Sequence, residues 1–143
     1  MSPVMSRNQP WEVVIIGAGP AGLAAATSVC RAARRVCVFD SHQYRNQPAN
    51  EIHNVVMHAG QQPDRFRSLS RQEIWNCFEH DITFIEATIS NINKVHVRDG
   101  QTGFELTDNA GNTYRGKKLV IATGSMDLMP NIPGYRDLFG HGM

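Results

Sequence analysis

The sequence predicts an α/β protein built on a Rossmann-like parallel sheet, with an antiparallel β-meander inserted into it. Three observations support this fold class. An apolar run at residues 13–16 leads into a glycine-rich turn and then into an alanine-rich segment with good helix propensity. Two more apolar runs, at residues 36–39 and 118–122, are typical of parallel strands buried on both faces. A segment with short strand patterns and turn residues lies between those two runs.

Length and composition indicate a single globular domain. The chain has 143 residues, of which 41% are hydrophobic and 19% are charged, with a net charge of +1. The near-neutral charge does not suggest a nucleic-acid partner, and no apolar run approaches the length of a membrane span. Residues 1–10 lack the apolar centre of a signal peptide, so we expect a cytoplasmic location. We expect these residues to form a disordered lead-in to a domain over residues 11–143.

The turn after the first apolar run has the spacing of a dinucleotide phosphate site, Gly17-x-Gly19-x-x-Gly22. The first glycine permits a tight turn, the second lets the backbone approach the phosphates, and the third lets the helix pack closely on the strand. Pro20 stands near the first position of a helix expected over residues 20–33, where its missing N–H costs nothing. The alternative is an ordinary strand–helix turn without a ligand.

The second strand, expected at residues 35–39, ends in Asp40. An acid about 20 residues beyond the glycine turn, at the tip of the second strand, accepts hydrogen bonds from the adenosine ribose of a bound dinucleotide. Asp40 could otherwise be a surface acid. The three arginines near the end of the first helix indicate charges that complement its dipole and not a nucleic-acid patch.

The remaining elements follow from local patterns. A polar connection at residues 41–63 is long enough to be functional. A helix is expected at residues 64–80, with Asp64 as its N-cap, and a third parallel strand at residues 82–85. The apolar face of this helix should hold Phe66, Leu69, Ile74, Cys77 and Phe78. Three meander strands are expected near residues 88–98, 103–107 and 113–115, then a buried strand at 118–122 and an irregular tail.

The three cysteines are Cys30, Cys37 and Cys77. They form no C-x-x-C pair, and no cysteine or histidine cluster has the spacing of a zinc site. We therefore interpret all three as inert buried thiols and expect no metal.

Several motifs together resemble one family of flavoproteins. They are VVIIGAGPAGLAAA, VFDSHQYRN, IHNVV, PDRFRSLSRQEI and KLVIATGSMDLMPNIPGYRDLFGHG. From about residue 11 to the end, the chain looks like the low-molecular-weight thioredoxin reductases, which belong to the class-II pyridine nucleotide-disulfide oxidoreductases. It looks closest to the branch that includes dithiol oxidases of the gliotoxin type.

This resemblance implies FAD as cofactor, bound at positions that match the family's motifs. The glycine turn would hold the pyrophosphate, and the acid would hold the adenosine ribose. Arg45 and Asn46 would run past the adenosine and pyrophosphate, and His53 and Asn54 would belong to the loop near the flavin ring. The last strand would end close to the cofactor. The implied residues are Gly17, Ala18, Gly19, Pro20, Ala21, Gly22, Asp40, Arg45, Asn46, His53, Asn54, Ala122, Thr123 and Gly124. Arg45, His53 and Asn54 could instead be ordinary loop residues, and Gly124 could only end a strand.

The chain also departs from the family. In the family a C-x-x-C redox pair soon follows the segment matched by residues 140–142, and a nicotinamide domain and a C-terminal return segment complete the protein. None of these occurs within residues 1–143. We therefore expect a partial FAD-binding domain with no catalytic residues of its own, and a sheet left open to a partner chain or a second copy.

Two functional interpretations stay open. In the first, the chain is the FAD-binding part of an oxidoreductase acting on disulfide or dithiol substrates that are small molecules of secondary metabolism. In the second, it is a truncated, catalytically incomplete homologue that acts as an interaction module or has no role of its own. An NAD(P) dehydrogenase is less favoured, because no acid/base residues stand at a recognisable spacing.

Overall fold

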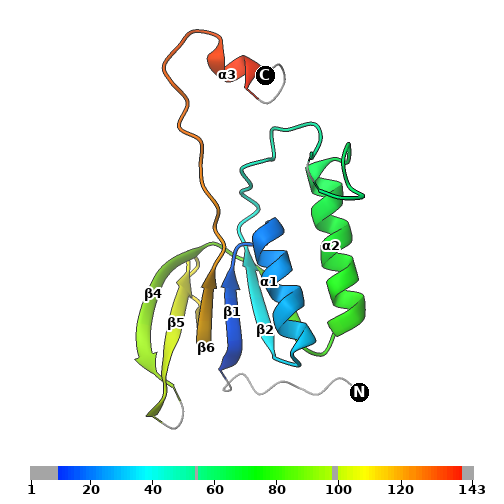
Figure 1. Ribbon diagram of the computed structural model, residues 1–143. Coiled ribbons are helices and arrows are strands. Elements are labelled where there is room, and N and C mark those ends of the chain that lie inside the picture. Colours follow the sequence, from blue (N-terminus) through cyan, green and yellow to red (C-terminus); the bar gives the residue numbers. More distant parts are fainter. Residues whose placement is uncertain (1–9, 54, 98–99, 140–143) are drawn as a thin grey trace.

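The structure, a computed structural model, describes residues 10–53, 55–97 and 100–139. It contains a six-stranded sheet in the order β3-β2-β1-β6-β5-β4, with two long helices on one face (Figure 1). The elements are β1 Trp11–Ile16, α1 Pro20–Arg31, β2 Val36–Asp40, α2 Pro63–Phe78, β3 Ile82–Glu86, β4 Ile89–His96, β5 Thr102–Asp108, β6 Thr113–Ile121 and α3 Tyr135–Leu138. The predicted fold class, a Rossmann-like sheet with an antiparallel insertion, is confirmed.

The parallel half of the sheet carries the cofactor motifs. β1 pairs in parallel with β2 on one side and β6 on the other, and β2 pairs in parallel with β3. Every residue of β2 is buried, as expected for a strand enclosed on both faces. Because the carboxyl ends of β1, β2 and β6 lie at the same edge, the segments that follow them meet there.

Two apolar clusters hold the layers together, one on each face of the sheet. On the helix face, Leu23 and Ala26 of α1 and Ile74 of α2 pack on alternate strand residues such as Ile15 and Val38. On the opposite face, Leu106 of the meander packs against Val14, Cys37 and Phe39. The curled meander therefore supplies the second layer that a parallel sheet needs.

The expected end of the sheet needs one correction. The third meander strand and the final buried strand are not separate, because β6 runs continuously through both. Its first part pairs antiparallel with β5 and its second part pairs in parallel with β1, and Gly116 takes part in both registers. The polar residues at 115–118 suggested a break between two strands. A single strand can nevertheless pair with one neighbour along one edge and with another neighbour along its other edge.

The helices also differ from expectation at their ends. α1 stops at Arg31 because Ala33 adopts a left-handed conformation, with φ of 53°. The amides of Ala33 and Arg34 bond the carbonyls of Cys30 and Val29, which closes the helix in a Schellman motif. α2 begins at Pro63 with Gln62 as N-cap, so the prediction that Asp64 caps it was wrong.

The buried face of α2 is more polar than the sequence suggested. It is formed by Pro63, Arg67 and Ile74, whereas Leu69 and Cys77 are exposed. Cys77 was therefore wrongly predicted to be buried, because the helix is turned so that an arginine stripe faces the sheet. Cys30 and Cys37 are buried as predicted, and burial raises the pKa of their thiols to about 11 and about 12.

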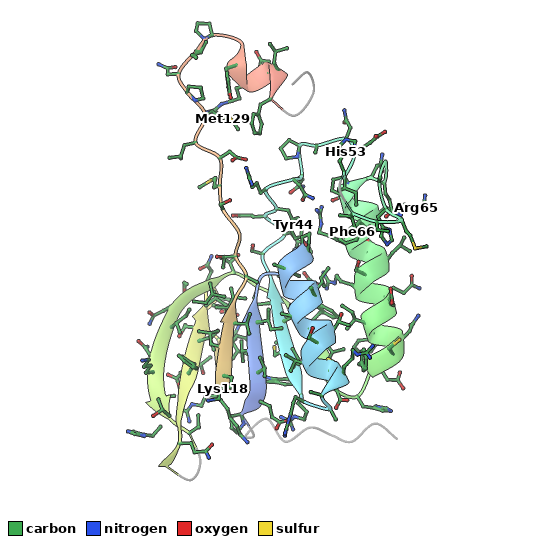
Figure 2. All side chains as sticks on the ribbon, viewed as in Figure 1. Tyr44, His53, Arg65, Phe66, Lys118 and Met129 are labelled. Carbon is green, nitrogen blue, oxygen red and sulfur yellow. The ribbon has the colours of Figure 1, made fainter. Side chains whose placement is uncertain are left out.

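The tail after β6 is irregular as expected, apart from the single turn α3. It leaves the carboxyl end of β6 and extends beyond the sheet edge (Figures 1 and 2). Met126 and Leu128 are almost fully exposed along it. Residues 1–9 and 140–142, for which a lead-in and a family motif were predicted, lie outside the described residues. Within the described part of the chain, no helix combines the length and apolar character needed to cross a membrane.

Candidate functional site

A cavity of about 390 Å³ opens at the carboxyl edge of the parallel strands. The glycine turn, the tip of β2, the loop that follows it and the segment after β6 form its walls. Among the residues singled out from the sequence, those that line it are Gly17, Ala18, Gly19, Pro20, Ala21, Asp40, Arg45, Asn46, Ala122, Thr123 and Gly124. Ligands of open α/β sheets bind at this edge.

Three residues singled out from the sequence do not line this cavity. Gly22 is buried inside the first turn of α1, where it packs beneath the site. His53 is exposed on the connection that leads to α2, away from the glycine turn (Figure 2). Asn54 lies outside the described residues.

The glycines of the turn meet different constraints. Gly17 has φ of 107°, and a Cβ there would overlap the Ala122 carbonyl. A Cβ at Gly22 would overlap the Gly17 carbonyl oxygen. At Gly19, by contrast, a Cβ would have nothing within 4 Å. The first and third glycines are therefore required by the fold itself, while the space beside the second is left open toward the cavity.

The amino end of α1 presents a positive pole to this space. Gly19 is the N-cap, Pro20 is the first helical residue, and no side chain caps the helix or places an acid in its first turn. The first amides of a helix have no intrahelical acceptor, and the helix dipole favours an anion beside them. The turn therefore fits a phosphate or pyrophosphate group.

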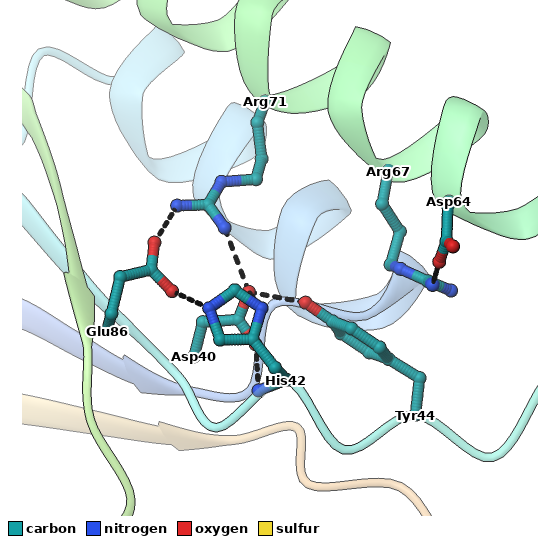
Figure 3. A network of polar contacts seen from close by, with 7 residues as sticks. All are labelled: Asp40, His42, Tyr44, Asp64, Arg67, Arg71 and Glu86. Atoms are coloured by element: carbon teal, nitrogen blue, oxygen red, sulfur yellow. Dashed lines mark hydrogen bonds and ion pairs between the residues drawn. The ribbon is translucent and has the colours of Figure 1, made fainter. Parts of the chain in front are cut away.

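Asp40 lies at the tip of β2 with only 2% of its surface exposed, within a polar network (Figure 3). Its Oδ1 accepts the backbone N–H of His42 at 2.9 Å. Its Oδ2 accepts the Tyr44 hydroxyl at 2.5 Å and Nη1 of Arg71 at 2.9 Å. Burial, followed by the bond to Asp40, raises the pKa of the Tyr44 hydroxyl, so this donor keeps its proton. The buried carboxylate thus has a counter-charge and defined donors.

Two arginines of α2 shape this network, and sequence reasoning missed both. Arg71 also pairs with Glu86 at the end of β3. Arg67 is buried, and its guanidinium carbon lies 3.8 Å from the centre of the Tyr44 ring. Arg67 also donates a hydrogen bond to the Asn46 side chain at 3.0 Å. The two arginines are four residues apart and therefore lie on one face of the helix. This spacing could have revealed them, but the face toward the sheet was expected to be apolar.

Asp40, His42 and Glu86 bring potential metal-ligand atoms within 4.8 Å of one another. The positive charge among them is already provided by the protein, because the Arg71 guanidinium pairs with both carboxylates. His42 also pairs with Glu86. The cluster therefore functions as an ion-pair network, and we assign no metal to it.

Arg45 lines the cavity, and its side chain pairs with Asp127 of the tail at 2.9 Å. The hydrogen bond between them raises the pKa of Arg45 and lowers that of Asp127. A second cavity, of about 450 Å³, continues from the first between this loop and the tail, and Met126, Met129 and Phe139 contribute apolar walls to it. The first cavity therefore contains the buried carboxylate of Asp40, and the second extends the site along the tail.

Comparison with known proteins identifies the family. The profile of the pyridine nucleotide-disulphide oxidoreductase family matches residues 11–143. This chain belongs to that family. It is 39% identical to the thioredoxin reductase aclD of Aspergillus oryzae over 127 residues, which are 89% of this chain and 39% of the relative. It is 38% identical to the thioredoxin reductase tcpT of Claviceps purpurea, over 95% of this chain and 41% of the relative.

Solved structures agree with the fold. HlmI superposes with a TM-score of 0.83 at 30% identity, covering 92% of this chain and 40% of that one. A thioredoxin reductase TrxB from Bacillus anthracis gives a TM-score of 0.82 at 28% identity, covering 91% and 42%. The resemblance to thioredoxin reductases is therefore confirmed. The chain spans about two-fifths of the length of these relatives.

Thioredoxin-reductase-like members of the family generally bind FAD. The cavity residues fit this group in three respects. The open space beside Gly19 permits close backbone approach, the bare end of α1 suits the pyrophosphate, and the buried carboxylate of Asp40 suits a ribose hydroxyl. When bound, FAD supplies the electron transfer, while the residues described here would bind and orient it.

Proposed function

We propose that this chain binds FAD and forms the FAD-binding part of a thioredoxin-reductase-like oxidoreductase that acts on disulfide or dithiol substrates. The cavity at the carboxyl edge of β1, β2 and β6 carries this proposal, because it brings the bare helix end and the buried acid to the same space. These groups match the two polar parts of the adenosine half of FAD, the pyrophosphate and the ribose.

The proposed assignment runs along the cavity. The turn from Gly17 to Ala21 would hold the pyrophosphate, and Asp40 would accept a ribose hydroxyl. Arg45 and Asn46 would run past the adenosine and pyrophosphate, and the segment 122–124 would pass close to the flavin half, where the second cavity continues from the first. His53 and Asn54 would approach the flavin only if the connection at residues 41–62 carries them there.

The substrate class rests on the resemblance to dithiol-oxidising relatives, which suggests a small thiol or disulfide of secondary metabolism. The cysteines of this chain do not themselves suit that chemistry. Cys30 and Cys37 are buried with raised pKa values, so they hold their protons, and Cys77 is exposed on α2 without lining the main cavity. A redox dithiol and a nicotinamide site would be supplied by another part of the assembly.

An interaction module is the second candidate function, and one observation favours it. Large apolar side chains at the edge of the sheet and along the tail are exposed, namely Ile121, Met126, Leu128 and Ile132. Exposed apolar groups of this kind are typical of surfaces that a partner chain or a second copy covers. Light scattering over a range of protein concentrations would distinguish self-association from a stable monomer.

Cofactor binding is tested by titrating the purified protein with FAD and recording the visible spectrum of bound flavin after gel filtration. We expect the wild-type chain to retain flavin. Gly19→Val should lose it, because the new side chain fills the open space where the backbone would meet the phosphates. Ala24→Val, on an exposed position of the same helix, is the matched control and should bind as wild type does.

Two results would contradict the proposal. A wild-type protein that stays colourless at high FAD concentration would refute cofactor binding by this chain. Unchanged affinity in Gly19→Val would refute the placement of the pyrophosphate at the turn, even if flavin is retained.

A further inference from the structure

We propose that Arg71 is a positioning residue for the adenosine end of the cavity, acting through Asp40. This inference rests on the proposed function, since it concerns how that site is held in shape. Arg71 does not line the cavity, whereas Asp40 does. The guanidinium reaches from α2 to the tips of two adjacent strands, pairing with Asp40 of β2 and with Glu86 of β3 (Figure 3).

The geometry of the guanidinium suits this bridging role. An arginine presents five N–H donors in one rigid plane, so it can fix two carboxylates relative to each other. Nη1 of Arg71 donates to Asp40, and Nη2 donates to Glu86. The guanidinium carbon lies 4.6 Å from the centre of the Phe84 ring, so a cation–π contact also holds the guanidinium in place. A lysine could reach only one of these partners with comparable geometry.

The donors around Asp40 show what the bridge achieves. An ionised carboxylate has about four acceptor positions. Among the described residues, the Tyr44 hydroxyl and Arg71 both bond Oδ2, while Oδ1 takes only the His42 amide. Arg71 and Tyr44 together therefore use the capacity of Oδ2 and leave one acceptor position on Oδ1. That position is available to a ribose hydroxyl from the cavity.

A second contact from α2 fixes the neighbouring wall. Arg67 stacks on the Tyr44 ring and donates to Asn46, and both of these residues line the cavity. Tyr44 thereby joins the two arginines, because its ring contacts Arg67 and its hydroxyl bonds the carboxylate held by Arg71. Helix α2 thus sets the shape of the loop at residues 41–46, although α2 itself lies outside the cavity.

A purely structural role for Arg71 makes a different prediction. If the arginine only tied α2 to the sheet, its loss would destabilise the protein without a specific effect at the site. Positioning instead predicts a local change at Asp40 and weaker binding of any ligand that carries the adenosine end. The two roles can be separated by amide exchange at His42, whose N–H bonds Oδ1 of Asp40.

The test compares Arg71→Met, Arg71→Lys and Arg65→Met with wild type. Arg65 is exposed on the same helix and forms no ion pair with another described residue, so it controls for charge and helix propensity. Two properties are measured: hydrogen exchange of the His42 amide without ligand, and the dissociation constants of FAD and of ADP. ADP shares the adenosine and pyrophosphate with FAD but has no flavin.

We expect Arg71→Met to accelerate exchange at His42 about tenfold and to weaken FAD and ADP equally, by roughly ten- to a hundredfold. Arg71→Lys should fall between Arg71→Met and wild type, and it also serves if Arg71→Met does not fold. Arg65→Met should match wild type in both measurements.

Three results would overturn the proposal: unchanged affinity in the Arg71 variants, acceleration spread evenly over α2 without a local effect at His42, or loss of FAD binding with ADP unaffected. If wild type binds ADP but not FAD, the proposed flavin function fails, and the Arg71 inference is decided on ADP alone. If wild type binds neither, both fail.

Discussion

Individual glycines of the phosphate turn answer to different constraints, and substitution can separate them. Gly22→Ala should destabilise the protein by at least about 3 kcal/mol, because the new Cβ would overlap the Gly17 carbonyl oxygen and backbone cannot move aside cheaply. Gly19→Ala should change the free energy of unfolding by less than about 1 kcal/mol, since nothing lies within 4 Å of its Cβ. Urea denaturation measures both values. Comparable destabilisation by the two variants would contradict this division between fold and site.

Asp108 makes the hairpin between β5 and β6 sensitive to acid. Its carboxylate accepts bonds from the amides of Ala110 and Asn112, the Asn112 side chain and the Tyr114 hydroxyl. These bonds, the Asn112 side chain foremost, hold the pKa of Asp108 below its ordinary value of 3.8. The ionised form is therefore favoured in the folded state, and its stabilising effect is present above pH 3.8 and is lost as the pH falls through the folded pKa.

Asp108→Asn tests this linkage. At pH 6 the variant should unfold at a lower urea concentration than wild type, because an amide accepts fewer of these bonds. The gap should shrink as the pH is lowered below 3.8, where wild type also loses the charge. A gap that is constant between pH 6 and pH 3 would show that Asp108 acts without titrating.

Helices and strands of this protein were predictable where the pattern is local. β1, β2 and β3 each contain an apolar run, and the glycine turn follows β1 directly, so their order and direction could be read from the sequence. β6 was split into two because its polar middle resembles a turn. The α2 face was misassigned because Arg67 is buried by partners, Tyr44 and Asn46, that lie more than 20 residues away in the chain. Arg67 also pairs with Asp64, three residues earlier on the same helix, but the two partners that bury it have no local signature.

Gly116 is the point at which β6 changes from antiparallel to parallel pairing. A Cβ at this position would lie 2.5 Å from Cγ2 of Val14, a fully buried side chain. Gly116→Ala should therefore destabilise the protein by about 1–3 kcal/mol through overpacking. Lys117→Ala, at the exposed neighbouring position, is the control and should cost less than about 0.5 kcal/mol. Thermal or urea unfolding measures the difference, and equal values for the two would argue against the tight packing.

For the molecule as a whole, the site divides into a part that the sequence showed and a part that it did not. The glycine turn and Asp40 occur at fixed spacing, and the turn is continuous in the chain, so the motif identified them. The residues that hold the site in shape, Arg67, Arg71 and Glu86, come from α2 and β3. They reach the site only in the folded protein, where β3 pairs with β2 and α2 packs beside it. Motif reading finds groups that contact a ligand directly and misses the groups that hold them.

The cysteines offer a probe of the whole fold. Cys30 and Cys37 lie in the two apolar clusters on opposite faces of the sheet, and their raised pKa values keep them as unreactive thiols. Cys77 is exposed. A maleimide at neutral pH should therefore modify Cys77 quickly, and Cys30 and Cys37 only when the molecule unfolds.

FAD should change these rates selectively if it binds the folded chain. A ligand at 100 times its dissociation constant stabilises the native state by about 2.7 kcal/mol, which lowers the unfolded population about a hundredfold. Modification of Cys30 and Cys37, followed by mass spectrometry under conditions where refolding outpaces labelling, should slow to the same extent. Cys77 should react at an unchanged rate and so serves as an internal control. If FAD protected Cys77 and left the two buried thiols unaffected, the cofactor would be acting at the surface of α2, and the cavity assigned to it would be wrong.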